Sequence, residues 1–88
     1  MDFDSVWQKI IMSENNNFKT VTGKVFSYTI SDTLLHPVVK DKEIRNISKN
    51  NIEKAFSEWP VSKPSGFSSS IQGTSYLFAL FADKRIME

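Results

Sequence analysis

The stretch ISKNNIEKAFSEW, residues 47–59, is the most clearly specified element of this 88-residue chain. Its larger apolar side chains recur at the spacing that places one stripe along a helix of 3.6 residues per turn. Lysine, asparagine, serine and glutamate occupy the opposite side. The pattern predicts an amphipathic helix whose buried stripe is Ile52, Ala55, Phe56 and Trp59.

Both ends of this helix are marked in the sequence. Ser48 stands at the N-cap position, where its hydroxyl can accept a bond from a free amide of the first turn, and Ile47 before it can act as a hydrophobic staple. Asn51 replaces the Glu or Gln of a complete capping box, so we expect this partial cap to contribute about 1 kcal/mol. Pro60 ends the helix because it disfavours helical geometry in Trp59 and has no N–H to donate.

The chain before this helix predicts a first helix and then a hairpin. Apolar residues at helical spacing indicate a helix over residues 4–12, after which a run of Ser, Glu and Asn favours a loop. Residues 18–22 and 25–30 are rich in β-branched and aromatic side chains and are separated by Gly and Lys, which is typical of two paired strands. One face of the second strand should cover the core with Phe26, Tyr28 and Ile30.

A third strand is expected over residues 34–39. Pro37 should confine it to a sheet edge or an irregular connection, because proline cannot donate to a strand ladder. Residues 40–43 then form a charged tip of alternating sign, and residues 44–47 are long enough for a last short strand. These segments predict a three- to four-stranded antiparallel sheet.

The chain after the amphipathic helix contains one long loop and one apolar segment. Residues 60–70 are rich in Pro, Gly and Ser. Because such a segment can bury little surface, we expect it to be mobile relative to the core. Residues 76–82 are continuously apolar, which fits a buried helix, the interpretation we adopt, or a buried central strand. Asp83, Lys84 and Arg85 are expected to be exposed to solvent at the end of this segment.

Composition supports a single α+β domain over residues 1–88. Seven Phe, two Trp and two Tyr supply enough large apolar side chains for one core. The absence of cysteine excludes disulfides and thiolate metal sites, and it favours a reducing, cytoplasmic location. No signal-peptide pattern opens the sequence, and no apolar run approaches the roughly 20 residues of a membrane span. We therefore expect no membrane association.

Enzymatic motifs are nearly absent, so we predict that the protein is not an enzyme. The single histidine, His36, is more simply a surface or packing residue. Asp41 and Glu43 alternate with lysines, which disfavours a metal site there. The serines near residues 68–70 have no spacing that suggests a base, and no phosphate-binding glycine loop is present. We expect no metal and no cofactor.

The distribution of basic residues gives one functional hypothesis, a DNA-binding module. The formal net charge is only +1, but basic side chains gather in the middle third of the sequence. A basic turn and the exposed face of the central helix would contact phosphates, and the helix N-terminus could accept one. The alternative is a solvated helix face with internal ion pairs. The predicted nucleic-acid-binding residues are Lys40, Lys42, Arg45, Lys49, Asn50 and Lys54.

A second hypothesis is a protein-binding adaptor or inhibitor. Trp59, Val61 and Phe67 are apolar residues in or beside the long loop, and no periodic pattern guarantees their burial. They could anchor a protein partner, or they could cover the domain's own core. The strand at residues 34–39 could also present an edge for strand addition. Salt dependence separates the hypotheses, since phosphate contacts weaken steeply with salt and apolar anchors do not.

Overall fold

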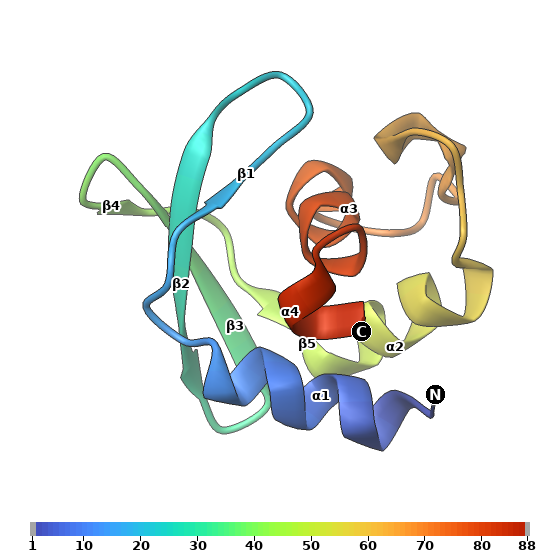
Figure 1. The fold of residues 1–88 in the computed structure, drawn as a ribbon, viewed down its shortest axis with the longest axis horizontal. Helices are drawn as coiled ribbons and strands as arrows, with labels where there is room; N and C mark the ends of the chain where they lie inside the picture. Colours follow the sequence, from blue (N-terminus) through green and yellow to red (C-terminus); the bar gives the residue numbers. More distant parts are fainter. Residues whose placement is uncertain (1, 88) are drawn as a thin grey trace.

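The computed structural model describes residues 2–87, which form the predicted α+β architecture (Figure 1). The α-helices are α1 (Phe3–Met12), α2 (Lys49–Glu58), α3 (Thr74–Phe81) and α4 (Lys84–Met87), and η1 (Pro64–Gly66) is a 3-10 helix. The strands are β1 (Phe18–Lys19), β2 (Val25–Ser31), β3 (Leu34–Val39), β4 (Lys42–Glu43) and β5 (Ile47–Ser48). In Figure 1 the described α-helices lie on one side of the sheet.

The sheet is antiparallel, with the order β1-β2-β3-β4, and β5 pairs with the other end of β3. The β2–β3 register pairs Tyr28 with Pro37 and Ile30 with Leu35, and these residues lie on the inner face, toward the helices. Phe26 and Tyr28 are buried, as their alternation predicts. The outer face carries Ser27, Thr29 and other partly exposed residues of the same strands.

Pro37 lies in a central strand, so the prediction that it confines residues 34–39 to an edge is wrong. The strand has β2 on one side and both β4 and β5 on the other. The carbonyl of Pro37 accepts from the amide of Ile44 at 2.8 Å, in the connection between β4 and β5. In an antiparallel sheet the amide nitrogen and the carbonyl of one residue point toward the same neighbouring segment. The nitrogen of Pro37, which has no N–H to donate, therefore points toward this irregular connection, and no β2–β3 hydrogen bond is lost. The last strand is also shifted from residues 44–47 to Ile47–Ser48.

The inner face of the sheet packs against α1 and α3 around a core of aromatic and branched side chains. Tyr28 lies at its centre, fully buried, and its hydroxyl donates to the carbonyl of Ile10 at 2.6 Å. Burial raises the pKa of the Tyr28 phenol well above its usual range, since the phenolate would lose its hydration. Tyr28 therefore remains a neutral donor that links the end of α1 to β2.

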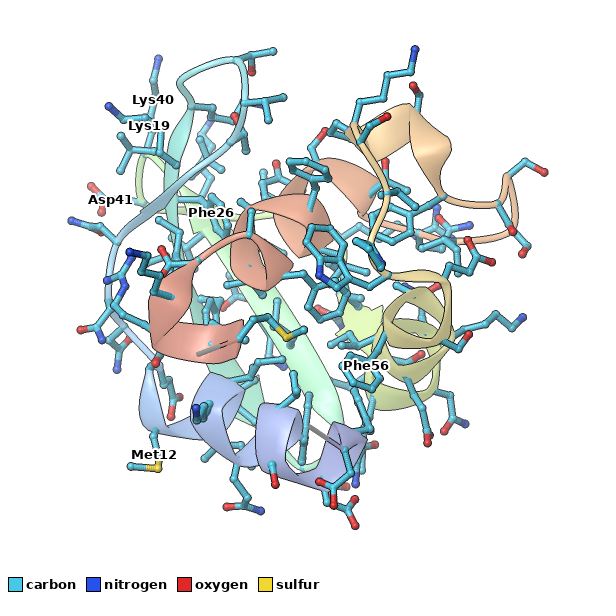
Figure 2. The ribbon with its side chains drawn as sticks, turned by 45° about the vertical axis from the view of Figure 1, so that its right-hand side comes forward. Met12, Lys19, Phe26, Lys40, Asp41 and Phe56 are labelled. Carbon is cyan, nitrogen blue, oxygen red and sulfur yellow. The ribbon has the colours of Figure 1, made fainter. Side chains whose placement is uncertain are left out.

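Helix α2 has the cap that the sequence predicts. Ser48 is extended, and its Oγ accepts from the amide of Asn51 at 3.1 Å. Ile52 and Ala55 are buried on the apolar stripe, and Phe56 packs partly buried between α1 and the rest of the core (Figure 2). The helix ends at Glu58 because the residue before Pro60 is extended.

The C-terminal third differs from expectation in two places. Helix α3 is the predicted buried helix, and Lys84 and Arg85 after it are exposed as expected, but the unpredicted helix α4 then returns Ile86 to the core with no exposed surface. The long loop is also anchored. It contains η1, and the side chain of Phe67, the next residue, is only 6% exposed.

We predict that Tyr28→Phe lowers the free energy of unfolding by about 0.5–1.5 kcal/mol, because it removes the buried bond from the phenol to the carbonyl of Ile10, which keeps its longer bond of 3.3 Å from the amide of Ser13. Urea denaturation of the two proteins measures the difference. Tyr76→Phe is the control, since Tyr76 is only partly buried, and its change should stay within about 0.5 kcal/mol. Equal losses in both variants would contradict this role for the Tyr28 hydroxyl.

We predict that Gly73→Ala destabilises the fold more than Gly23→Ala. Both glycines have positive φ, +68° and +91°, where an L-residue costs about 1–2 kcal/mol. A Cβ on Gly73 would also overlap the Cδ1 of Ile47, whereas a Cβ on Gly23 meets open space. Thermal unfolding of both variants isolates the steric part, and equal midpoints would contradict the close packing of Gly73 on Ile47.

Candidate nucleic-acid interface

The loop between β1 and β2 has a fixed conformation at one end of the sheet. The amide of Thr20 donates to the carbonyl of Lys24 at 2.9 Å, and the amide of Lys24 donates back to Thr20 Oγ1 at 3.1 Å. The hydroxyls of Thr20 and Thr22 lie 3.1 Å apart. Gly23 reverses the chain with a positive φ that other residues adopt with strain. Lys24 is therefore presented from an ordered loop.

The turn between β3 and β4 lies at the same end of the sheet. Its two central residues, Lys40 and Asp41, have φ values of +52° and +65°. Positive φ at both positions is the geometry of a two-residue turn that suits the twist of paired strands. Both side chains are exposed, so the turn presents one cation and one anion to solvent.

An open cavity of about 620 Å³ lies between these two turns. Lys24 lies on its wall from the β1–β2 loop and Lys40 from the β3–β4 turn, while Val25 and Val39 supply apolar surface. Val25 is 51% exposed, so part of its side chain faces solvent at the cavity. The volume is within the range of small-molecule sites.

The strand register extends this basic surface to a third lysine. Lys19 is paired with Val25, and continuing the β2–β3 register beyond Ser27 and Val38 sets Val25 opposite Lys40. Direct cross-strand partners share a face about 5 Å apart. Figure 2 shows Lys19 and Lys40 together at this end of the sheet, with side chains directed away from Phe26 in the core. Lys42 pairs with Val39 and so lies at the same end of the sheet, on the other face. We call this end of the sheet, with Lys19, Lys24, Lys40 and Lys42, the hairpin end.

Arg85 borders the hairpin end but its charge is already compensated. Its guanidinium donates to both carboxylate oxygens of Asp83 at 2.9 Å and to the carbonyl of Asn17 at 3.0 Å, and it lies 4.1 Å from the centre of the Phe18 ring. The hydrogen bonds from Arg85 hold the pKa of Asp83 below its usual range. Arg85 thus fastens α4 to β1. A cavity of about 290 Å³ lies beside it and shares Val25 with the larger one.

The structure does not bring the six predicted nucleic-acid-binding residues onto one face. Lys40 and Lys42 lie in or next to the β3–β4 turn, whereas Asn50 and Lys54 are exposed on α2, far across the fold (Figure 1). Arg45 is exposed in the connection between β4 and β5. Lys49 is half-buried, with its Nζ 5.5 Å from the centre of the Trp7 ring.

The N-terminus of α2 has less capacity for a phosphate than the sequence suggested. The amide of Lys49 donates to the carbonyl of Thr33 at 2.8 Å, and that of Asn51 donates to Ser48. The side chain of Asn51 makes two bonds of 2.9 Å with the backbone of Gln72, donating to its carbonyl and accepting from its amide. These bonds hold the residue 72 segment against the first turn of the helix.

The balance of charges makes the hairpin end a better candidate than α2 for binding phosphate. The hairpin end has four lysines and two neighbouring carboxylates, Asp41 and Glu43, which leaves an excess of two positive charges. On α2 the two lysines are balanced by Glu53 and Glu58. The sequence interpretation missed Lys19 and Lys24. The signal was available, because the first and third turns of an antiparallel meander lie at the same end of the sheet.

The three residues of the protein-binding hypothesis belong largely to the domain's own packing. The Trp59 ring lies 5.4 Å from Phe78, 5.5 Å from Phe81 and 6.3 Å from Phe67 between ring centres. Phe67 is buried. Val61 is half-exposed and packs against the backbone of Gly66.

Glu58 ties the long loop to the end of α2. One carboxylate oxygen accepts from the amide of Ser68 at 2.8 Å and the other from the Ser68 hydroxyl. The hydroxyl bond, followed by the amide bond, holds the pKa of Glu58 below its usual range. A lowered carboxylate pKa stabilises the fold above the unfolded-state pKa, and this contribution is lost as pH falls through the folded-state pKa.

We predict that Glu58→Gln makes the unfolding midpoint less sensitive to pH between pH 7 and pH 3, because Gln cannot lose the charge that Ser68 stabilises. Ser68→Ala should weaken the same dependence, and the double variant should add little to Glu58→Gln. Thermal unfolding followed by circular dichroism at several pH values measures all three. An unchanged slope in Glu58→Gln would contradict the linkage.

Other classes of site find little support in the described residues. Between residues 2 and 87, no three His, Asp or Glu side chains gather where they could hold a metal ion. In the same range no helix has the length and hydrophobicity needed to cross a bilayer. No protein-family model matches the chain, and searches of curated proteins and of solved structures found no match.

Proposed function

We propose that this protein is a non-enzymatic nucleic-acid-binding module that contacts the phosphate backbone of DNA with the hairpin end. One observation carries the proposal. Lys24 and Lys40, which are distant in the sequence, lie on the walls of the same open cavity of about 620 Å³. Lys19, paired with Val25, extends the outer side of this end of the sheet, and Lys42, paired with Val39, lies at the same end on the other face. The excess of positive charge at this end is larger than on α2.

Exposed lysines are better suited to binding the phosphate backbone than to reading the bases. An ammonium group on a flexible stem interacts with phosphate as a point charge and reads no sequence. The hydroxyls of Thr20 and Thr22 add donors beside the cavity, and exposed Val25 offers apolar surface to a sugar. The expected mode is binding with weak sequence preference and strong dependence on salt.

The residues proposed on α2 and in the adjoining connection remain secondary contacts. Asn50 and Lys54 are exposed, but Glu53 and Glu58 on the same helix repel phosphate, and Lys49 is drawn toward Trp7. Arg45 is exposed between the two regions. The protein-binding alternative has weaker support, since Phe67 is buried and Trp59 packs on three core aromatic rings.

We predict that Lys24→Glu/Lys40→Glu abolishes binding to a fluorescein-labelled, mixed-sequence DNA duplex at low salt, because both cavity walls become negative. The matched control is Lys49→Glu/Lys54→Glu, which changes the net charge by the same amount on α2. Fluorescence anisotropy of wild type and both variants measures affinity over a range of salt. Four phosphate contacts give a slope of log K against log salt of about −3 to −4 for wild type.

Three outcomes distinguish the proposals. Loss in the hairpin variant with little change in the α2 variant supports the hairpin end. The reverse result moves the interface to α2. No binding by wild type to duplex DNA at low salt overturns the DNA proposal, and single-stranded DNA and RNA of the same sequence, tested in parallel, show whether another nucleic acid is bound.

A further inference from the structure

Three polar side chains form a hydrogen-bonded chain on the outer face of the sheet. Ser31 Oγ lies 2.7 Å from His36 Nε2, and His36 Nδ1 lies 2.6 Å from Asn46 Oδ1. The register places Ser31 and His36 as diagonal neighbours on β2 and β3, since His36 pairs with Thr29. Asn46 comes from the connection between β4 and β5 on the other side of β3. Three separate segments thus converge on one imidazole.

The chemistry of the partners fixes the direction of both bonds. An amide oxygen only accepts, so His36 Nδ1 carries the proton and donates to Asn46. In the neutral imidazole Nε2 is then the acceptor, and the Ser31 hydroxyl donates to it. This is the tautomer in which a histidine can take the proton of a serine.

Accessibility matches this role. The His36 side chain is only 16% exposed, so its ring is held in place, while Ser31 is exposed and open to a reagent. Glu43 Oε1 lies 3.9 Å from His36 Nδ1, on the same side of the ring as Asn46. A nucleophile bonded to a base, with the base oriented by a third group, is the general arrangement of an activated serine.

We propose that Ser31 is an activated nucleophile that accepts an acyl group from activated esters, with His36 as its base and Asn46 as a positioning residue. Ser31 Oγ forms a bond to the acyl carbon, and the bond from that carbon to the leaving thiolate or phenolate breaks. The serine proton passes to His36 Nε2 and then to the leaving group. The product is an ester at Ser31.

The expected effect is selective reactivity, since a positioned general base contributes about 10²–10⁴-fold. Ser31 lies at the opposite end of β2 from Val25 and Lys19, and Glu43, which neighbours Lys42, lies between the two sites and approaches His36. The two proposals rest on different side chains, Ser31 and His36 in one case and the lysines in the other. Each proposal can fail without the other.

The test is labelling of the intact protein with a fluorophosphonate probe, in which a P–O bond to serine replaces the P–F bond and fluoride leaves. Peptide mapping by mass spectrometry gives the rate at each serine. We expect Ser31 to react about 100-fold faster than the exposed loop residues Ser65 and Ser69 of the same molecules. A rate at Ser31 no greater than at these internal controls overturns the proposal.

Variants show whether Ser31 reacts quickly because His36 activates it or only because it is exposed to solvent. Ser31→Ala should abolish the fast adduct, and His36→Ala should slow labelling of Ser31 to the rate of Ser65, with recovery on addition of free imidazole. Asn46→Ala should slow it, while Asn46→Asp, which keeps an acceptor for Nδ1, should restore it. Circular dichroism confirms that each variant is folded. Unchanged labelling of Ser31 in folded His36→Ala overturns the proposed base.

Discussion

The attachment of the end of α1 to β2 is the constraint on which the rest of the structure depends. Strand β1 is only two residues long, so beyond Phe26 the edge of β2 has no strand partner on that side. The turn after α1 supplies the missing partners: the amide of Asn15 donates to the Tyr28 carbonyl, and Glu14 Oε2 accepts from the Ile30 amide, each at 2.9 Å. With the Tyr28 hydroxyl bonded to Ile10, α1 is fixed across the inner face.

This attachment decides which parts of the molecule are available for function. Helices α1 and α3 cover the inner face, and the outer face, with Ser27, Thr29 and His36, stays partly exposed. Chemistry-bearing side chains therefore collect on the outer face and at the ends of its turns, where the strand register decides which of them meet. The hairpin end begins at Val25 and the hydrogen-bonded group of Ser31, His36 and Asn46 begins at Ser31, the two ends of β2.

Local patterns predicted the elements well, because each depends on neighbours in the sequence. The cap at Ser48, the stripe of α2 and the alternation of Phe26 and Tyr28 all reappear in the structure. The edge position predicted for Pro37 was wrong. A proline lacks an N–H toward only one of the two neighbouring strands, and the sequence does not show on which side the neighbour is irregular. Helix α4 was missed because four residues are too few for a periodic signal, and its position depends on Arg85 bonding to Asn17.

The candidate sites were harder to predict, because they are made by register. Basic density along the sequence identified Lys40 and Lys42 but not Lys19, which reaches the same surface through its pairing with Val25. His36 is the single histidine of the sequence, and no neighbouring motif marks it. Its partners Ser31 and Asn46 are close only once β3 lies between β2 and the β4–β5 connection.

The shortness of the outer strands also bears on how this protein behaves among copies of itself. A β-sheet edge is a template for further strands, and long, flat, apolar edges polymerise. Here β1 and β4 each offer two residues, and Lys19 and Lys42 occupy one position in each. A second chain finds little backbone to pair with and meets a positive charge on approach. The lysines proposed to attract a polyanion thus also oppose edge-to-edge aggregation.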